Sequence, residues 1–174
     1  KEFVQKVRIL TESLPYIKEF TGKTVVVKLG GEALKDENVF KTITEDIALM
    51  KYIGIKPVIV HGGGVEITQT PKDMNIQTEF VNGLRKTDKK TAQVVEMVLG
   101  ASVNKKIVHA IQNCGVEALG LSGCDTNLFE VQKIFPNGKD LGFIGEVTKV
   151  NEKILNVLIE NSYIPIIAPV SKDE

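Results

Sequence analysis

Two short apolar segments, each running into glycines, constrain the fold of this chain more than any other feature. Residues 24–29 read TVVVKL and lead into Gly30-Gly31, and residues 57–60 read PVIV and lead into residues 61–64, a histidine and three glycines. Apolar runs without polar alternation are typical of strands covered on both faces of a parallel sheet. The carboxyl ends of such strands meet at one edge, where ligands bind. The pair therefore predicts an α/β fold with a ligand site at that edge.

The segments between and after these strands alternate between helical and strand patterns. Phe40, Ile43, Ile47 and Met50 recur at helical spacing before Gly54, which stands where a C-cap belongs. The later pattern predicts a helix over 91–113 ended by Gly115, a strand over 118–121, a helix capped by Asn151, and a strand over 164–167. This alternation predicts a three-layer α/β/α sandwich with a mainly parallel sheet.

Two segments depart from the alternation. Residues 129–150 contain two strand candidates separated by Pro136-Asn137-Gly138, a strong turn signal, and predict an inserted β-hairpin. Near the N-terminus, apolar residues at helical spacing predict an amphipathic helix that Pro15 ends or kinks: Phe3, Val7, Leu10 and Leu14. We therefore expect an N-terminal helix over residues 1–20 and a ligand-binding lobe over residues 21–174.

Composition argues against several classes of protein. The 22 Lys and Arg residues balance the 22 Asp and Glu residues, so net charge favours neither nucleic acid nor an anionic membrane. No run of about 18 apolar residues could span a bilayer, and the N-terminal segment is unlike a signal peptide. Cys114 and Cys124 have no metal-binding or disulfide spacing and are expected to be reduced, structural thiols. We expect a soluble cytoplasmic protein, with a plastid location left open for a eukaryotic source.

The glycine turns are the first candidate site. Lys28 stands beside Gly30-Gly31, whose backbone amides can approach a phosphate closely, although a lysine there can also simply reach solvent. The glycines of residues 61–64 can form a nest of amide donors for an anion, or only a tight turn. His61, at the end of a buried strand, is more typical of a satisfied structural residue than of a general base.

A second candidate is Arg85, which follows a glycine turn and precedes a helix. Its planar fork can hold a carboxylate through two parallel hydrogen bonds, whereas the alternative is a solvated surface arginine. No metal-ligand set is predicted. Half of a dinucleotide-binding oxidoreductase is disfavoured, because the sixth position counted from Gly62 is Ile67 rather than glycine and the acidic partner for the ribose is also lacking. No phosphate loop of the GxxxxGK[ST] type occurs in the sequence either.

Six strings, in this order, resemble the acetylglutamate kinases of the amino acid kinase family: VVVKLGGEAL, PVIVHGGG, EFVNGLRKTD, VVEMVLGASVNKKIV, LGFIGEVTKVN and YIPIIAPV. The resemblance spans nearly the whole chain and implies the N-terminal lobe of the amino acid kinase fold. It implies a lobe that binds N-acetyl-L-glutamate, whose side-chain carboxylate takes a phosphoryl group from ATP with Mg²⁺. That reaction is the second step of arginine biosynthesis by the acetylated route.

The resemblance also implies roles for particular residues. Lys28 and Gly31 contact the transferring phosphoryl group and, with Gly30, hold the nucleotide's phosphates. Gly63-Gly64 face substrate and phosphate, with Gly63 among the catalytic residues, and Arg85 holds the α-carboxylate of the substrate. The attacking carboxylate, with an unperturbed pKa of about 4, is already ionised at neutral pH, so no general base is needed. Lysine, glycine amides and magnesium are suited to cancelling charge on phosphoryl oxygens.

The resemblance has further implications and some departures. The N-terminal helix resembles the extension of arginine-inhibited hexameric members, which implies a homo-oligomer of dimers joined by these helices and arginine as a feedback inhibitor. Pro71 predicts a shortened or displaced helix after Gly64, and residues 122–126 differ from the family's loop, so no ligand contact is assigned there.

The family's nucleotide-binding lobe has no counterpart in the 174 residues. The open hypotheses are a kinase lobe inactive by itself, a catalytically silent binding or regulatory subunit, or another amino acid kinase such as glutamate 5-kinase or carbamate kinase.

Overall fold

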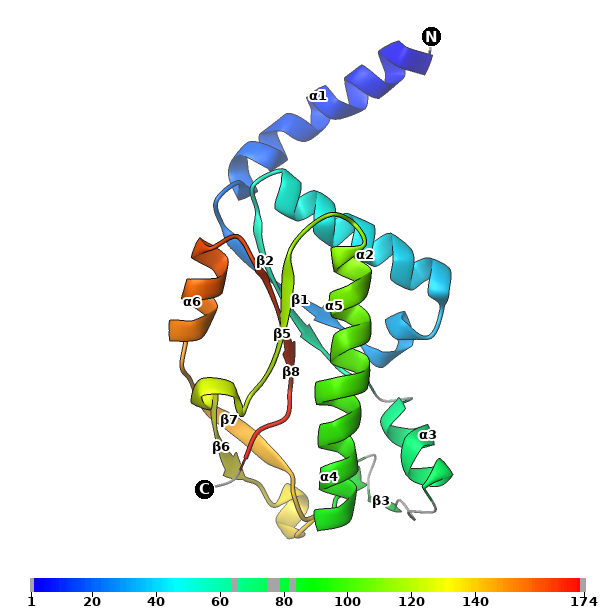
Figure 1. Cartoon of the computed structure of the whole chain (residues 1–174), viewed down its shortest axis with the longest axis vertical. Coiled ribbons are helices and arrows are strands. Elements are labelled where there is room, and N and C mark those ends of the chain that lie inside the picture. The colour runs from blue at the N-terminus through cyan, green and yellow to red at the C-terminus, as the bar shows by residue number, and fades with distance from the viewer. Residues whose placement is uncertain (1, 64–65, 75–78, 82–83, 173–174) are drawn as a thin grey trace.

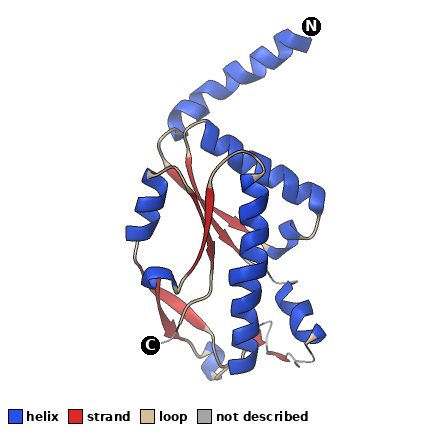
Figure 2. Ribbon diagram, in the orientation of Figure 1, coloured by secondary structure: helices blue, strands red, loops and turns tan. Residues whose placement is uncertain are grey.

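A four-stranded parallel sheet forms the centre of the computed structural model, which describes residues 2–63, 66–74, 79–81 and 84–172. Its strand order is β1-β2-β8-β5. The strands are β1 (Thr24–Leu29), β2 (Lys56–His61), β5 (Ala118–Ser122) and β8 (Ile164–Ala168). Figures 1 and 2 show helices on both faces of this sheet, so the predicted α/β sandwich with a mainly parallel sheet is confirmed.

Two hydrophobic cores lie on the two faces of the sheet. The larger core packs beneath α2 (Glu37–Tyr52) and α5 (Asn104–Gln112), and the smaller core beneath α6 (Lys153–Glu160). Successive side chains of β8 pack into opposite cores, because side chains alternate between the two faces of a strand. Ile166 lies in the larger core and Ile167 in the smaller. All five residues of β8 are buried, as its unbroken apolar sequence predicts.

Strand β1 differs from its prediction. It forms an edge of the sheet, and of its six residues only Leu29 is buried, whereas Val26 is 65% exposed. The expectation that β1 is covered on both faces is therefore wrong for the described residues. An apolar run indicates a strand, but whether neighbours cover that strand depends on the order in which the sheet assembles.

The N-terminal helix α1 (Glu2–Phe20) extends away from the body of the protein, and none of its residues is buried. The helix continues through Pro15 to Phe20, in agreement with the expected range of residues 1–20; of the two effects expected of Pro15, ending or kinking the helix, the first does not occur. Proline removes one backbone donor but leaves the hydrogen bonds on either side available. The end of α1 is tied to the body where the Gly22 amide donates to the Gly54 carbonyl at 2.8 Å.

The predicted long helix begins at Lys89 and is interrupted by a π-helical segment. It consists of α4 (Lys89–Met97), a π-helical segment (Val98–Val103) and α5, capped at its start by Asp88, and Gly115 follows its end at φ 82°. Val94 and Val103 are both buried. In a regular α-helix the nine positions between these residues correspond to about two and a half turns, so the two valines would lie on opposite faces. The π segment corrects this phase and keeps both valines in the core.

The remaining elements lie around the carboxyl edge of the sheet. The predicted hairpin is confirmed as β6 (Phe129–Lys133) and β7 (Gly145–Val150), which are antiparallel. The others are a 3₁₀ turn η1 (Gly31–Leu34), helix α3 (Glu66–Asp73), a small antiparallel pair β3 (Glu79–Val81) and β4 (Leu84–Lys86), and 3₁₀ turns η3 (Asp125–Asn127) and η4 (Pro136–Gly138).

Glu152 stands at the N-cap position of α6 without a side-chain capping bond, and Asn151 supplies the predicted capping hydrogen bond from one residue earlier. The side-chain Oδ1 of Asn151 accepts from the backbone amide of Lys153 at 3.3 Å, and its Nδ2 donates to the backbone carbonyl of Thr126 at 3.0 Å. Asn151 therefore ties the start of α6 to the turn η3. None of the described helices combines the length and apolarity needed to cross a bilayer.

Candidate functional site

The two glycine turns lie side by side at the carboxyl edge of the sheet. Leu29 at the end of β1 pairs in register with His61 at the end of β2. The Gly62 amide then donates to the Leu29 carbonyl at 2.8 Å. A Cβ atom added to Gly62 would lie 3.8 Å from the Gly31 nitrogen. The two turns therefore form one continuous glycine-lined edge, as the sequence predicted.

The first turn is open to solvent. Lys28 and Gly30 are exposed, and a Cβ atom added to Gly30 would meet no atom within 4 Å. Gly31 opens the 3₁₀ turn η1, in which the Ala33 amide donates to the Gly30 carbonyl at 3.1 Å. A ligand could therefore approach the backbone of this turn closely, because Gly30 has no side chain in the way, and the exposed Lys28 supplies an ammonium group.

The second turn packs against the π segment. Gly63 is buried, and a Cβ atom added to it would lie 2.6 Å from Leu99 Cδ2 and 3.3 Å from Val103 Cγ2. Glycine is thus required here for packing. Segments of π-helix are rare and are frequently found at functional sites. Gly64, the other predicted residue of this turn, lies outside the described residues.

Arg85 reaches the helix that follows the second glycine turn. Its Nη2 donates to the Thr68 hydroxyl on α3 at 2.8 Å, so Thr68 is a neighbour that sequence patterns did not reveal. Partial burial lowers the pKa of the Arg85 guanidinium, yet arginine remains charged near neutral pH. A charged fork on this side of the molecule can hold a carboxylate.

His61 is buried and hydrogen-bonded, as expected for a histidine at the end of a buried strand. It is 1% exposed, and its Nε2 lies 3.2 Å from the amide nitrogen of Asn104, which is 0% exposed. Its Nδ1 lies 3.0 Å from the Gly62 carbonyl. Burial lowers the pKa of His61, opposed by the Gly62 hydrogen bond and the charge of Glu66. Nothing in the sequence distinguished Asn104 from the other polar residues of α5.

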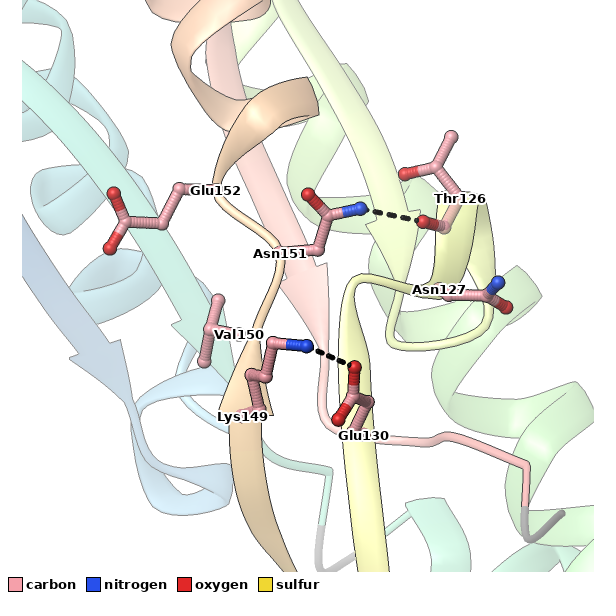
Figure 3. Close-up of a pocket in the computed structure, with 7 residues that line it drawn as sticks. All are labelled: Thr126, Asn127, Glu130, Lys149, Val150, Asn151 and Glu152. Atoms are coloured by element: carbon pink, nitrogen blue, oxygen red, sulfur yellow. Dashed lines mark hydrogen bonds and ion pairs between the residues drawn. The ribbon is translucent and has the colours of Figure 1, made fainter.

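A groove of about 480 Å³ lies at the base of the hairpin (Figure 3) and is lined by Thr126, Asn127, Glu130, Lys149, Val150, Asn151 and Glu152. Lys149 Nζ lies 2.7 Å from Glu130 Oε1, and the Asn151 amide bonds Thr126. Four lining residues therefore bond to one another rather than converge on a ligand. We take the glycine-lined edge as the candidate site.

Within the described ranges, no three or more His, Cys, Asp or Glu side chains are grouped so that they could hold a metal ion. The candidate site is accordingly built from amides and cationic side chains, which suit anions.

Comparisons with known proteins agree on one family. The model of the amino acid kinase family matches residues 23–174. The chain is 51% identical, over 168 residues, to an acetylglutamate kinase from Caldanaerobacter subterraneus subsp. tengcongensis, covering 97% of this chain and 56% of that protein. It is 49% identical to an acetylglutamate kinase from Petrotoga mobilis, covering 95% of this chain and 55% of the relative. The chain thus spans little more than half the length of these curated relatives.

Solved structures with the same fold include the N-acetylglutamate synthase from Neisseria gonorrhoeae, complexed with coenzyme A and N-acetyl-glutamate. Its TM-score is 0.79 at 21% identity, covering 96% of this chain and 38% of that chain. The protein smu.665 from Streptococcus mutans UA159 matches with a TM-score of 0.73 at 28% identity, covering 86% of this chain and 60% of that chain.

Proposed function

The chain belongs to the amino acid kinase family, and on this premise we propose that it is the substrate-holding lobe of an acetylglutamate kinase. In this role it binds N-acetyl-L-glutamate while the side-chain carboxylate takes a phosphoryl group from ATP, a step of arginine biosynthesis. Support comes from relatives that are acetylglutamate kinases at 45–51% identity. The observation that carries the proposal is the hydrogen bond from the Gly62 amide to the Leu29 carbonyl, which joins the two glycine turns into one glycine-lined edge.

Each predicted residue has a chemical role in this proposal. The Arg85 fork holds the α-carboxylate of the substrate through parallel hydrogen bonds, which fixes its orientation. In this proposal the amide of Gly63 faces the reacting carboxylate; the same role for Gly64, which lies outside the described residues, rests on the sequence alone. The acceptor carboxylate is ionised at neutral pH, so the lobe needs to position it and to neutralise charge rather than to remove a proton.

ATP supplies the phosphoryl group in this proposal, and Lys28 with the amides of Gly30 and Gly31 are the residues of this chain that would face its phosphates. Their openness to solvent and the absence of a side chain at Gly30 suit such a contact. The described residues offer no carboxylate cluster for Mg²⁺.

Replacing Arg85 by lysine tests the substrate assignment. Arg85→Lys is expected to weaken N-acetyl-L-glutamate binding by about tenfold or more, because a two-point carboxylate contact becomes a single point charge. Isothermal titration calorimetry measures the affinity, with L-glutamate as the comparison ligand. The matched control is Arg8→Lys on α1, where Arg8 is exposed and paired with Glu12. Equal affinity in Arg85→Lys and the unmodified chain would contradict the assignment.

We also propose that α1 joins copies of this chain. Its apolar face is exposed, with Phe3 77% and Leu10 65% exposed, and an amphipathic helix gains stability when such a face is buried. Deleting residues 1–14 is therefore expected to lower the oligomeric mass while leaving the thermal unfolding transition of the sandwich in place. Light scattering combined with circular dichroism measures both, and an unchanged mass would refute this role of the helix.

A further inference from the structure

The buried pair of His61 and Asn104 lies directly behind the second glycine turn. His61 ends β2, whereas Asn104 opens α5 immediately after the π segment. Both side chains are buried and lie 3.2 Å apart between Asn104 Nδ2 and His61 Nε2. A buried polar pair is costly unless every group in it is hydrogen-bonded, so its bonding pattern is informative.

Asn104 can only act as a donor toward His61. Its Nδ2 also donates to the Ile166 carbonyl at 2.9 Å and lies 3.4 Å from the Leu121 carbonyl, and carbonyls only accept. Its Oδ1 accepts from Lys105 Nζ at 3.1 Å, which agrees with this orientation of the amide. His61 Nε2 must therefore be the acceptor, and the ring is neutral with its proton on Nδ1.

The Nδ1 proton fixes the direction of one peptide group. It donates to the Gly62 carbonyl at 3.0 Å and so holds that oxygen toward the buried ring. The peptide from Gly62 to Gly63 is planar and trans, which places the Gly63 N–H opposite the Gly62 oxygen. The Gly63 amide proton consequently points away from His61.

We propose that His61 and Asn104 are positioning residues, which through the Gly62 carbonyl aim the Gly63 amide at the bound anion. The identity of that anion, N-acetyl-L-glutamate, rests on the proposed function. The direction of the Gly63 N–H does not, because it follows from the hydrogen bond between His61 and the Gly62 carbonyl. The surroundings accommodate the pair: a Cβ atom at position 120 would lie 1.7 Å from Asn104 Oδ1, so Gly120 provides the space that Asn104 occupies.

The first arm of the test is spectroscopic and independent of any ligand. Long-range ¹H–¹⁵N correlation spectra of the labelled chain report the tautomer of both histidines, with exposed His109 as the internal reference. The expected result is a neutral Nδ1–H ring for His61. Asn104→Leu, which removes the donor, is expected to change that tautomer while His109 stays unchanged. An Nε2–H ring in the unmodified chain would overturn the inference.

The second arm measures N-acetyl-L-glutamate affinity in two variants of His61. His61→Asn places an amide nitrogen where Nδ1 was and keeps a donor for Gly62, so its affinity is expected to stay within about threefold of the unmodified chain. His61→Leu removes the donor and is expected to lose about tenfold or more. Thermal unfolding is recorded for both variants, because a merely structural histidine would predict that affinity follows stability.

The outcomes separate this inference from the proposed function. A folded His61→Leu variant with unchanged affinity would overturn the inference and leave the proposed function intact. If the unmodified chain binds no N-acetyl-L-glutamate, the proposed function is wrong, and the tautomer spectra alone decide the inference. The spectra also decide it if His61→Leu fails to fold.

Discussion

The 174-residue chain by itself is expected to form no acyl phosphate above background with saturating ATP, Mg²⁺ and N-acetyl-L-glutamate. Its acetylglutamate kinase relatives are nearly twice as long, and the chain matches 56% of the first of them. Holding donor and acceptor in line accounts for about 7 to 11 kcal/mol of barrier lowering. A lobe that positions only the acceptor should therefore lose about 10⁵-fold or more in rate.

Trapping with hydroxylamine measures this loss, because acyl phosphates form stable hydroxamates. The matched sample is a fusion of this chain to the remaining part of the Caldanaerobacter relative, which is 51% identical over the shared region. The fusion is expected to turn over. Robust turnover by the 174 residues alone would show that this chain also positions the nucleotide. A fusion that binds N-acetyl-L-glutamate without turning over would favour a catalytically silent binding subunit.

The second large effect concerns stability. Gly120→Ala is expected to destabilise the fold by about 2 to 4 kcal/mol, through overpacking and broken buried hydrogen bonds. The added Cβ would lie 1.7 Å from Asn104 Oδ1, and Asn104 is fully buried and bonded to His61 and Ile166. Because that side chain is held on several sides, it cannot move aside without losing its partners.

Gly100→Ala is the matched control for this substitution. Gly100 lies in the π segment, and a Cβ atom added there would meet nothing within 4 Å. Alanine is favoured over glycine in a helix by about 0.5 to 1 kcal/mol, so this variant should be slightly more stable than the unmodified chain. Urea unfolding measures both values. Equal stabilities for the two variants would mean that the packing around Asn104 is looser than the structure shows.

The sequence predicted the features of the fold that depend on local patterns. Buried strands such as β8 are evident as apolar runs, and the hairpin follows from its turn residues. The exposure of Val26 could not be predicted, because a strand's own residues do not specify which neighbours will cover it. The π segment also escaped prediction, because it follows from the need to keep Val94 and Val103 on one face.

Part of the candidate site could also be predicted from the sequence, and part could not. The position of the two glycine turns beside each other could be predicted, because parallel strands have their carboxyl ends at the same edge of the sheet. The contacts of Arg85 with Thr68 and of His61 with Asn104 did not follow, because they join residues 17 and 43 positions apart through side chains. Gly64 remains a prediction from the sequence. The ligand roles of Lys28, Gly30, Gly31, Gly63 and Arg85 also remain predictions.

The most direct test of the central claim is to map N-acetyl-L-glutamate onto the chain by ¹⁵N chemical-shift perturbation. As the ligand is added, we expect the largest shifts on the Gly63 amide and on the Arg85 side chain. The hairpin groove serves as the internal comparison, and its amides, such as those of Glu130 and Lys149, should stay unchanged. Shifts concentrated on the groove, or no shifts at saturating ligand, would contradict the assignment of the glycine-lined edge as the substrate site.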